Sequence, residues 1–427
     1  MLDIGERIRQ LRMQKNLTQG DLVKNTFSIT YLSRIENGQI NPSQSFLKEM
    51  SKRLKVSMDD LLGENPIHRE ERVTLLFDKF FSSIMLSDEE LSFLHINAKE
   101  IHSPDTLIKI YGTLLSYYLI HKNMNEAEKI FTLSVHMLPD PIEDVDTKSL
   151  MYYYNACGSY FHFIQLYHRS DDYFTKAVSL TDNRMTIDNA RVFHNTSLAK
   201  QLVMGDQTLI SYYTTKAYHI SKSLDSSEML ARLFIIQGLQ YYTNRNYEES
   251  LKKLNHAREM TNPTNLKVQA SIDYNVGKAH RGLGHFEAAI ESYKKSIELN
   301  NETNEIEGTV DAYKELALIY INKRLWKEAN VYLSNALKLA KEFNLYYMMI
   351  ELGYIEASVH KVRGNDMTYE KEMQKTIDKG MNYEQYTLVR HMARELGDYF
   401  YEWRAYKKAA SFFKLALDNG VDLTYSE

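Results

Sequence analysis

Residues 277–299 read GKAHRGLGHFEAAIESYKKSIEL and carry a spacing that recurs along most of the chain. The small Gly277 is followed twelve residues later by Ala289, then by Tyr293 and Ser296. Two antiparallel helices approach closely only where the residues at their crossing are small, so this spacing predicts a pair of packed helices. An aromatic residue in the third place would fill the gap toward a neighbouring pair.

The same intervals occur in several other segments. Ala317 precedes Ala329, Leu333 and Ala336 in this way, and the anchors of all copies are Leu115, Gly158, Leu198, Gly238, Gly277, Ala317, Gly353 and Gly397. A period of about 40 residues predicts about eight stacked helical pairs over residues 104–420, preceded by another pair near 66–101. The intervals resemble those of the tetratricopeptide repeat, which implies a right-handed superhelix of helical pairs.

The composition also favours an all-α protein. Six prolines and 17 glycines in 427 residues leave few strand breaks, and 44% apolar with 25% charged residues is typical of a folded domain. No run of about 18 apolar residues is present, so no membrane partner is expected. The single Cys157 cannot form an internal disulfide, and the N-terminus has charges where a secretory signal is apolar. A cytoplasmic location is therefore expected.

The first 63 residues differ from the rest in charge. They hold 10 Lys and Arg against 7 Asp and Glu, whereas the remainder holds 42 against 49. A basic head on an acidic body is expected of a small nucleic-acid-binding module, because phosphates are neutralised on one surface only. Apolar residues at helical spacing (Ile4, Ile8, Leu11) predict a first helix, with these basic residues exposed: Arg7, Arg9, Arg12 and Lys15.

Capping residues divide the rest of this head into short helices. Thr18 can cap a second helix that begins at Gln19, and Ser28 a third that ends at Glu36 before the left-handed stop Asn37-Gly38. Two further helices are expected over 43–54 and 57–62. The head is therefore predicted to be a five-helix unit.

The order and lengths of these helices resemble the phage-repressor-type helix-turn-helix family. The motifs that carry the resemblance are LTQ at 17–19, YLSRIENG at 31–38, NPS at 41–43 and DLL at 60–62. In that family the third helix enters the major groove, which implies contacts with double-stranded DNA. The implied DNA-binding residues are Gln19, Ile29, Thr30, Ser33, Arg34, Asn41 and Ser43, with Arg34 best suited to a guanine. Relatives commonly have a glycine in the turn before the third helix, and VKNTFS at 23–28 has none.

The repeats predict a second binding surface. A stack of helical pairs forms a superhelix whose concave wall is made by the first helix of each pair. Polar side chains at wall-facing positions suit an extended peptide backbone, since an amide offers donors and an acceptor. The candidates for binding a short peptide are Asn155, His162, Asn195, Arg232, Tyr274, Asn275, Lys278, Arg281, Asp311 and Lys314. For each residue separately, pairing with a neighbouring helix is an equally good explanation.

No motif for catalysis is found in the sequence. A His-Glu-x-x-His motif, a cysteine pair and a Walker loop are all missing, so neither an enzyme nor a cofactor or metal site is expected. Cys157, between Ala156 and Gly158, is expected to be a small buried group at a helix crossing.

The combination of head and repeats resembles the peptide-pheromone-responsive helix-turn-helix/tetratricopeptide-repeat regulators of Firmicutes, the RRNPP group. Chain length and repeat number place it closest to the neutral-protease-regulator branch. The resemblance implies a quorum-sensing transcriptional regulator that binds DNA through residues 1–63 and a short imported signalling peptide through repeats at 104–427. Residues 64–103 would form a linker and the first helical pair. A homodimer or higher oligomer is expected, because paired heads would read a palindromic site.

Two alternative functions remain open from the sequence. Some members of the group bind a sporulation response regulator and remove its phosphate, and one branch uses a glutamine to do so. Residues 65–164, where that surface would lie, contain no glutamine, which favours sequestration of a response regulator over hydrolysis. The other alternative is a scaffold that collects protein partners and is tethered to DNA by its head.

Overall fold

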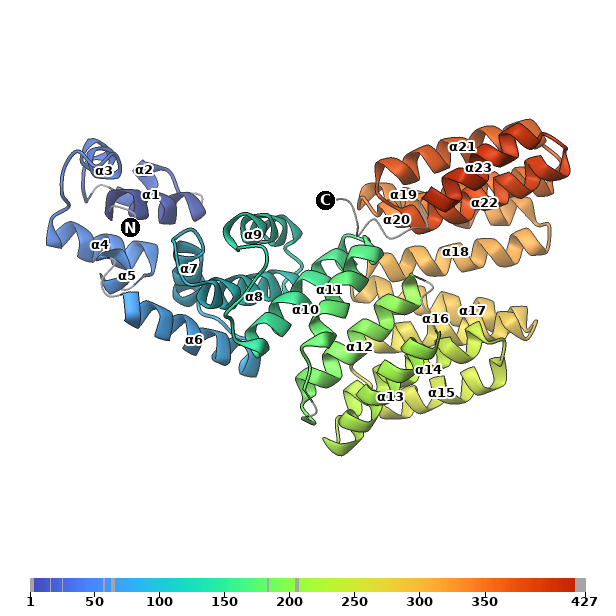
Figure 1. Cartoon of the computed structure of the whole chain (residues 1–427), viewed down its shortest axis with the longest axis horizontal. Helices are drawn as coiled ribbons and strands as arrows, with labels where there is room; N and C mark the ends of the chain where they lie inside the picture. Colours follow the sequence, from blue (N-terminus) through green and yellow to red (C-terminus); the bar gives the residue numbers. More distant parts are fainter. Residues whose placement is uncertain are drawn as a thin grey trace. The chain divides into compact units, whose positions relative to one another are not determined.

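The computed structural model consists of α-helices joined by short turns (Figure 1). It describes residues 4–15, 17–24, 26–56, 58–62, 66–182, 184–203 and 207–418, and no strand occurs in these ranges. Within them, every helix is too short or too polar to cross a bilayer. The start of the predicted head (1–3), its end with the next residues (63–65), and the end of the predicted repeats (419–427) lie outside the described residues.

Contacts divide the chain into two compact units. The first comprises Met1–Tyr160 with Asp172–Thr181, and the second comprises Phe161–Asp171 with Asp182–Glu427. The predicted domain boundaries at residues 63 and 103 both fall inside the first unit, and they stay predictions.

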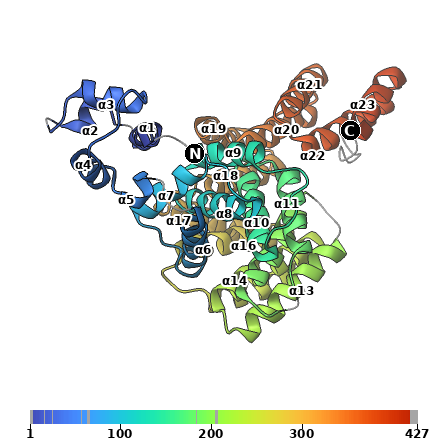
Figure 2. The ribbon, with the colours of Figure 1, turned by 60° about the vertical axis from the view of Figure 1, so that its left-hand side comes forward.

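The first unit begins with the five short helices predicted for the head (Figures 1 and 2). Their bounds are α1 Ile4–Gln14, α2 Gln19–Val23, α3 Ile29–Glu36, α4 Gln44–Leu54 and α5 Met58–Leu62. Thr18 caps α2 in a capping box with Asp21, and the Ser28 hydroxyl accepts a hydrogen bond from the backbone N–H of Tyr31. Both predicted caps are confirmed. The turn after α2 needs no glycine, since Lys24 adopts the left-handed conformation at φ 37°.

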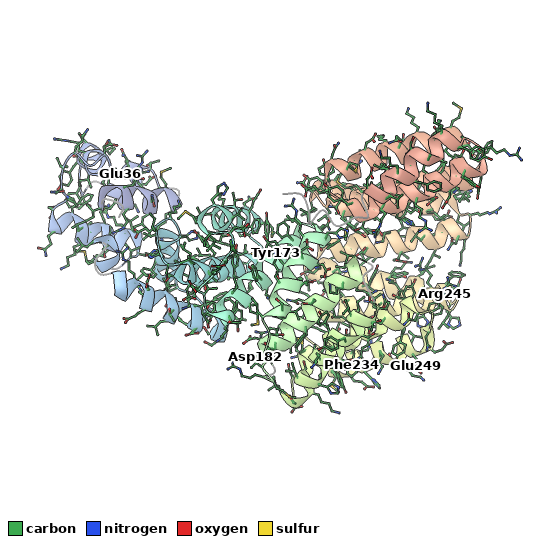
Figure 3. The ribbon with its side chains drawn as sticks, in the orientation of Figure 1. Glu36, Tyr173, Asp182, Phe234, Arg245 and Glu249 are labelled. Carbon is green, nitrogen blue, oxygen red and sulfur yellow. The ribbon has the colours of Figure 1, made fainter. Side chains whose placement is uncertain are left out.

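Two arginines of α1 contradict the prediction that this helix exposes its basic residues, since Arg7 is buried and Arg12 is half-buried. Arg7 is 2% exposed, and its guanidinium donates to the Glu100 carboxylate at 2.6 Å. Arg12 donates two hydrogen bonds, of 2.7 and 2.8 Å, to buried Glu36 (labelled in Figure 3). Their partners lie 93 and 24 residues away in sequence, which helical periodicity in α1 could not reveal. Arg9 is exposed as predicted.

The head packs directly against α7 Asp88–Asn97, the second helix after it. Ile96 of α7 belongs to the same apolar cluster as Ile8, Leu11 and Phe46 of the head. The other helix between the head and the first repeat is α6 Pro66–Ser83, and the first repeat pair is α8 Pro104–Ile120 and α9 Met124–Met137. The pair α6 and α7 corresponds to the pair predicted near 66–101.

Eight helical pairs, α8 to α23, follow in the described residues, as the repeat period predicted. After α8 and α9, their bounds are α10 Thr147–Phe163, α11 Tyr167–Ser179, α12 Ile187–Leu202, α13 Gln207–Ser223, α14 Ser227–Thr243, α15 Tyr247–Met260, α16 Leu266–Gly282, α17 Phe286–Glu302, α18 Ile306–Asn322, α19 Trp326–Glu342, α20 Tyr346–Val362, α21 Asp366–Asn382, α22 Tyr386–Glu402 and α23 Tyr406–Asp418. Among the last four helices, α20 to α23, each packs against the next one in sequence (Figure 1).

Small residues stand at the helix crossings, as the spacing requires. A Cβ placed on Gly277 would lie 2.6 Å from the ring of Tyr293, and one on Gly397 would lie 2.7 Å from the ring of Phe413. Tyr293 also joins the apolar cluster that contains Leu316 of the next pair. The aromatic residue therefore packs against its own pair and the following one, which explains why both positions recur together.

Each three-residue turn between described repeat helices contains one residue in the left-handed region, whereas the longer turn between α15 and α16 contains none. Arg245, labelled in Figure 3, has φ 58° between α14 and α15, and Arg324 and Arg404 have φ 56° and 57° in equivalent turns. This single conformation reverses the chain within three residues. The first helices of successive pairs then come into contact, since α12, α14, α16, α18, α20 and α22 touch one another in order.

Candidate functional site

An exposed face of α3 carries the residues predicted to read DNA. The Ile29 side chain is 54% exposed, and Thr30 and Arg34 are exposed one helical turn apart. In the described residues Arg34 has no ion-pair partner. Leu32 and Ile35 are buried on the opposite side of α3, so packing fixes which face points outward.

Of the other predicted DNA contacts, Gln19, Asn41 and Ser43 lie at or just before the starts of α2 and α4, whereas Ser33 lies within α3. Gln19 is half-buried, and its side-chain amide donates to Glu36 at 2.8 Å. Ser43 caps α4, accepting from the N–H of Phe46 at 3.2 Å, and Asn41 is exposed just before it. Ser33 is half-buried. These residues flank the face of α3, and their contact with DNA stays a prediction.

A cluster of tyrosines and charged side chains lies where α14, α16, α18 and α20 meet in the second unit. We call it the polar cluster, and its members are Tyr242, Tyr274, Lys278, Arg281, Asp311, Lys314, Glu315 and Glu351. Five of the ten residues predicted to bind peptide therefore lie together, because the repeat places them on neighbouring first helices.

Two cations of the polar cluster already have carboxylate partners. Arg281 lies 3.0 Å from Glu315 and also donates to the Tyr242 hydroxyl at 3.0 Å. Lys314 is 9% exposed and pairs with Asp311 at 2.8 Å and with Glu351 at 2.7 Å. Although burial alone would lower it, these carboxylates hold the Lys314 pKa well above its usual value.

Lys278 differs from these two cations because its neighbours are aromatic rings. Its ammonium lies 4.8 Å from the ring centroid of Tyr242 and 5.6 Å from that of Tyr274. No carboxylate of the described residues forms an ion pair with it. Burial is the main cause that lowers the Lys278 pKa, and the attraction of Glu315 does not compensate. An anionic ligand group at this point would stabilise the charged form.

Polar residues continue along the first helices toward the start of the second unit. In α12 a ring nitrogen of His194 lies 3.1 Å from the Asn195 amide oxygen. Burial lowers the pKa of both His194 and His162 to about 4, so both are neutral at pH 7. Arg232 is exposed and pairs with Glu228 at 3.1 Å, an exposed pair within one helix turn.

The remaining two asparagines are placed differently. The Asn275 amide donates to the backbone carbonyl of Ser271 in its own helix at 2.8 Å, and the residue is 8% exposed. Asn155 is half-buried in the part of α10 that belongs to the first unit. A peptide contact by either residue stays a prediction.

Sequence reasoning missed the turn between α10 and α11, which reaches helices far along the chain. The Gln165 side chain accepts from the backbone N–H of Tyr347 at 3.2 Å and donates to Glu307 at 3.4 Å. The ring of Tyr167 packs on that of Tyr347 with centroids 4.8 Å apart. Burial is the main cause that raises the Tyr167 pKa, and the nearby carboxylates of Glu307 and Asp311 raise it further. No sequence motif identifies these residues. The only signal in the sequence was their position in a turn between two repeat helices.

The grouping of possible metal ligands and the environment of the single cysteine bear on the chemistry that the described residues could perform. Among the described residues, no three His, Cys, Asp or Glu side chains lie close enough to hold a metal ion. Cys157 is fully buried, as predicted, and burial raises the pKa of its thiol to about 12.

Comparisons with known proteins agree with this architecture. Residues 8–61 match the family described as helix-turn-helix. The transcriptional activator NprA of Geobacillus stearothermophilus is 20% identical over 409 residues, which cover 91% of this chain and 96% of that protein. The helix-turn-helix match and this similarity support a transcriptional regulator with a DNA-binding head.

Solved structures share the fold. A Rap protein in complex with competence and sporulation factor superposes with a TM-score of 0.61 at 14% identity, over 82% of this chain and 98% of that one. NprR in complex with its cognate peptide NprX gives a TM-score of 0.59 at 14% identity, over 83% and 100% of the two chains. The predicted fold class, a helix-turn-helix head followed by tetratricopeptide-like pairs, is confirmed.

Proposed function

We propose that this chain, which is similar to the peptide-pheromone-responsive helix-turn-helix regulators of Firmicutes, controls transcription by binding an operator and a short peptide. The head would read DNA through the exposed face of α3, with Ile29, Thr30 and Arg34 toward base edges. Two heads in a homo-oligomer would read the halves of a palindromic operator.

The observation that carries the peptide half of the proposal is the position of Lys278. Lys278 is half-buried, its ammonium lies near two tyrosine rings, and the neighbouring cations Arg281 and Lys314 already have carboxylate partners. A peptide carboxylate at Lys278 would supply the missing anion, and the two rings would contact an adjacent apolar side chain. The likeness to NprR, solved with its peptide NprX, supports the same choice of ligand class.

Asn195 and its neighbours would bind another part of the same peptide. Asn195 and His194 present amide and imidazole groups on α12, and a peptide backbone needs both donors and acceptors. The ligand would be extended, since its two contacts lie on α12 and α16 with α14 between them.

Thermal unfolding with peptide libraries tests this proposal. Libraries of peptides of roughly five to ten residues, with a free C-terminal carboxylate or a C-terminal amide, are mixed with the full chain. A binding peptide raises the unfolding temperature through linkage and changes the affinity for operator DNA. Lys278→Met should weaken binding of the selected peptide by about 1.5–3 kcal/mol, as expected for a charged hydrogen bond.

Lys338→Met on α19 is the matched control, because Lys338 is an exposed lysine outside the polar cluster. It should leave peptide affinity unchanged. If no library member shifts the unfolding temperature while operator binding is normal, the chain is a DNA-binding protein without a peptide ligand. Sequestration of a response regulator would then be tested by co-elution of the two proteins without peptide.

A further inference from the structure

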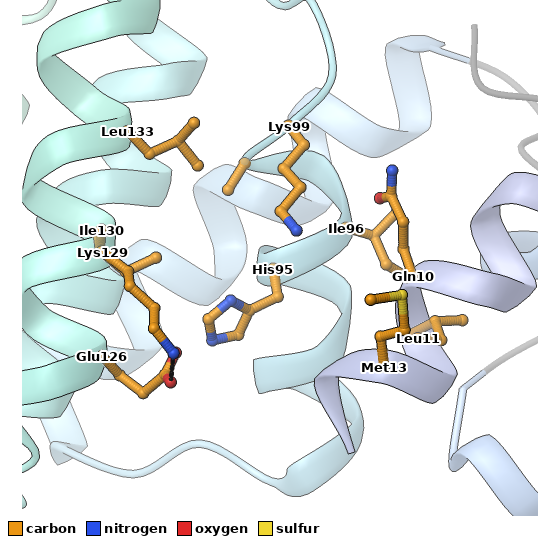
Figure 4. A pocket seen from close by; sticks show the side chains of 11 residues that line it. Gln10, Leu11, Met13, His95, Ile96, Lys99, Glu126, Lys129, Ile130 and Leu133 are labelled. Carbon is orange, nitrogen blue, oxygen red and sulfur yellow. Dashed lines mark hydrogen bonds and ion pairs between the residues drawn. The ribbon is translucent and has the colours of Figure 1, made fainter. Parts of the chain in front are cut away.

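A cavity of about 430 Å³ lies within the first unit, between α1 of the head and the helices α7 and α9 (Figure 4). Cavities of this size are in the range that binds small organic molecules. It is remote in sequence from the polar cluster and takes no part in the proposed peptide binding.

Apolar side chains from all three helices line the cavity. Leu11 on α1 and Ile96 on α7 are 0% and 5% exposed and belong to the core of the head. Ile130 and Leu133 face the cavity from α9. Because Leu11 and Ile96 are held by core packing, these walls are preformed and suit an apolar body.

The charge of the cavity is positive. Lys129 is neutralised by Glu126 at 2.6 Å, whereas Lys99 has no ion-pair partner among the described residues and points into the space in Figure 4. His95 also faces the cavity, but its ring is hydrogen-bonded to the Tyr118 hydroxyl. Burial lowers the pKa of His95 to about 4. The neutral imidazole leaves Lys99 as the group that would balance an anion.

An acceptor without a donor also lines the cavity. The Gln10 side-chain oxygen is buried, and no group of the described residues donates a hydrogen bond to it. An unpaired buried polar atom costs free energy, which a ligand N–H or O–H would recover.

We propose that this cavity is a second ligand site, which binds a small carboxylic acid with an apolar body and one hydrogen-bond donor. The carboxylate pairs with Lys99, the donor meets the Gln10 oxygen, and the apolar part packs on Leu11, Ile130 and Leu133. Such a ligand touches the DNA-reading head and two of the helices that follow it at once. It therefore stabilises the packing of α1 against α7 and α9.

N-octanoylglycine and its methyl ester are the probes, used with the full chain below their micellar concentrations and without DNA or peptide. The acid contains the carboxylate, an amide N–H and an apolar chain, whereas the ester lacks the charge. Titration calorimetry should show the acid binding at least tenfold tighter than the ester. Lys99→Met should remove this difference, and Lys52→Met, which changes an exposed lysine of α4, should preserve it.

A second variant tests the place of binding. Leu133→Trp fills the cavity from α9 and should abolish binding of the acid, while the unfolding temperature without ligand confirms that the variant is folded. Equal affinity for acid and ester, or unchanged binding in both Lys99→Met and Leu133→Trp, overturns the proposal. Failure here does not affect the peptide proposal, since the probes and variants act in a different unit.

Discussion

The side chain of Gln165 accepts a hydrogen bond from the backbone N–H of Tyr347, 182 residues further along the chain. This N–H lies in the first turn of α20, where helix donors have no partner in the helix itself, and Leu345 provides no side-chain cap. Gln165 is 1% exposed, and Glu307 accepts from its amide. The turn between α10 and α11 therefore caps a helix five pairs later.

Removing this cap should destabilise the second unit. Gln165→Ala removes the acceptor of the Tyr347 N–H and one donor to Glu307, which is expected to cost about 1–3 kcal/mol of unfolding free energy. Urea unfolding followed by circular dichroism measures the loss. Gln374→Ala is the control, because Gln374 bonds only to exposed Asp378 in its own helix. A loss equal in both variants would contradict the capping role.

Two glycines of the head should respond in opposite ways to the same change. A Cβ on Gly5 would lie 1.9 Å from the Ile35 backbone oxygen, so Gly5→Ala must separate α1 from α3. We expect an unfolded or weakly folded head and loss of DNA binding. A Cβ on Gly20 would lie no closer than 3.5 Å to a neighbouring side chain. Gly20→Ala in α2 should therefore be neutral or stabilise the folded head by about 0.5–1 kcal/mol. Thermal unfolding of the head and DNA-binding gel-shift assays, measured for both variants, distinguish Gly5→Ala from Gly20→Ala.

Arg34 is expected to contribute to the choice of operator sequence. If it contacts a guanine, Arg34→Ala should reduce discrimination at one base pair by about 1–3 kcal/mol and leave binding to nonspecific DNA nearly unchanged. Selection of bound duplexes from a random pool measures the preference of each variant. Arg9→Ala, an exposed arginine on α1, serves as the control. Unchanged preference in Arg34→Ala would mean that α3 does not read that base.

Acid should weaken the second unit before its carboxylates titrate. The pKa of His194 falls from 6.5 to about 4 on folding because the ring is buried, so the unfolded chain binds more protons between these values. The stability contributed by the neutral ring is complete above pH 6.5 and is lost as the pH falls toward 4. His194→Gln should flatten the decline in urea midpoint between pH 6.5 and 4.5. An identical slope in both proteins would exclude His194 as a cause.

Periodic features of the sequence were sufficient to predict the fold. The spacing of Gly277, Ala289 and Tyr293 predicts the crossing of two helices that are neighbours in sequence. Its recurrence along the chain predicted the number of helical pairs. The Thr18 and Ser28 caps are also local signals, which is why the starts of α2 and α3 were predicted. In the copy at Gly238, Ser250 stands twelve residues later in place of the alanine, and its hydroxyl donates to the Gly238 carbonyl at 2.7 Å.

Contacts between distant segments could not be predicted in this way. The sequence predicts that Arg7 is exposed, because it is a basic residue outside the apolar series that contains Ile8 and Leu11. Only the folded structure brings Glu100 into contact with it. Gln165 belongs to a turn and matches no motif, yet it joins three segments of the chain. Periodicity correctly placed Lys278, Arg281 and Lys314 on neighbouring helices. Which of these side chains forms an ion pair with a carboxylate depends on side-chain geometry, which periodicity does not contain.

The turns at Arg324, Asn344, Glu384 and Arg404 have a consequence for how such a chain changes length. Each helix from α18 to α22 has 17 residues and starts 20 residues after the one before, because every reversal uses the same left-handed conformation. Excising or duplicating a block of two helices and their turns would thus rejoin the backbone in phase. A gain or loss of one or two residues inside a helix would instead rotate the rest of that helix and turn its buried face toward water.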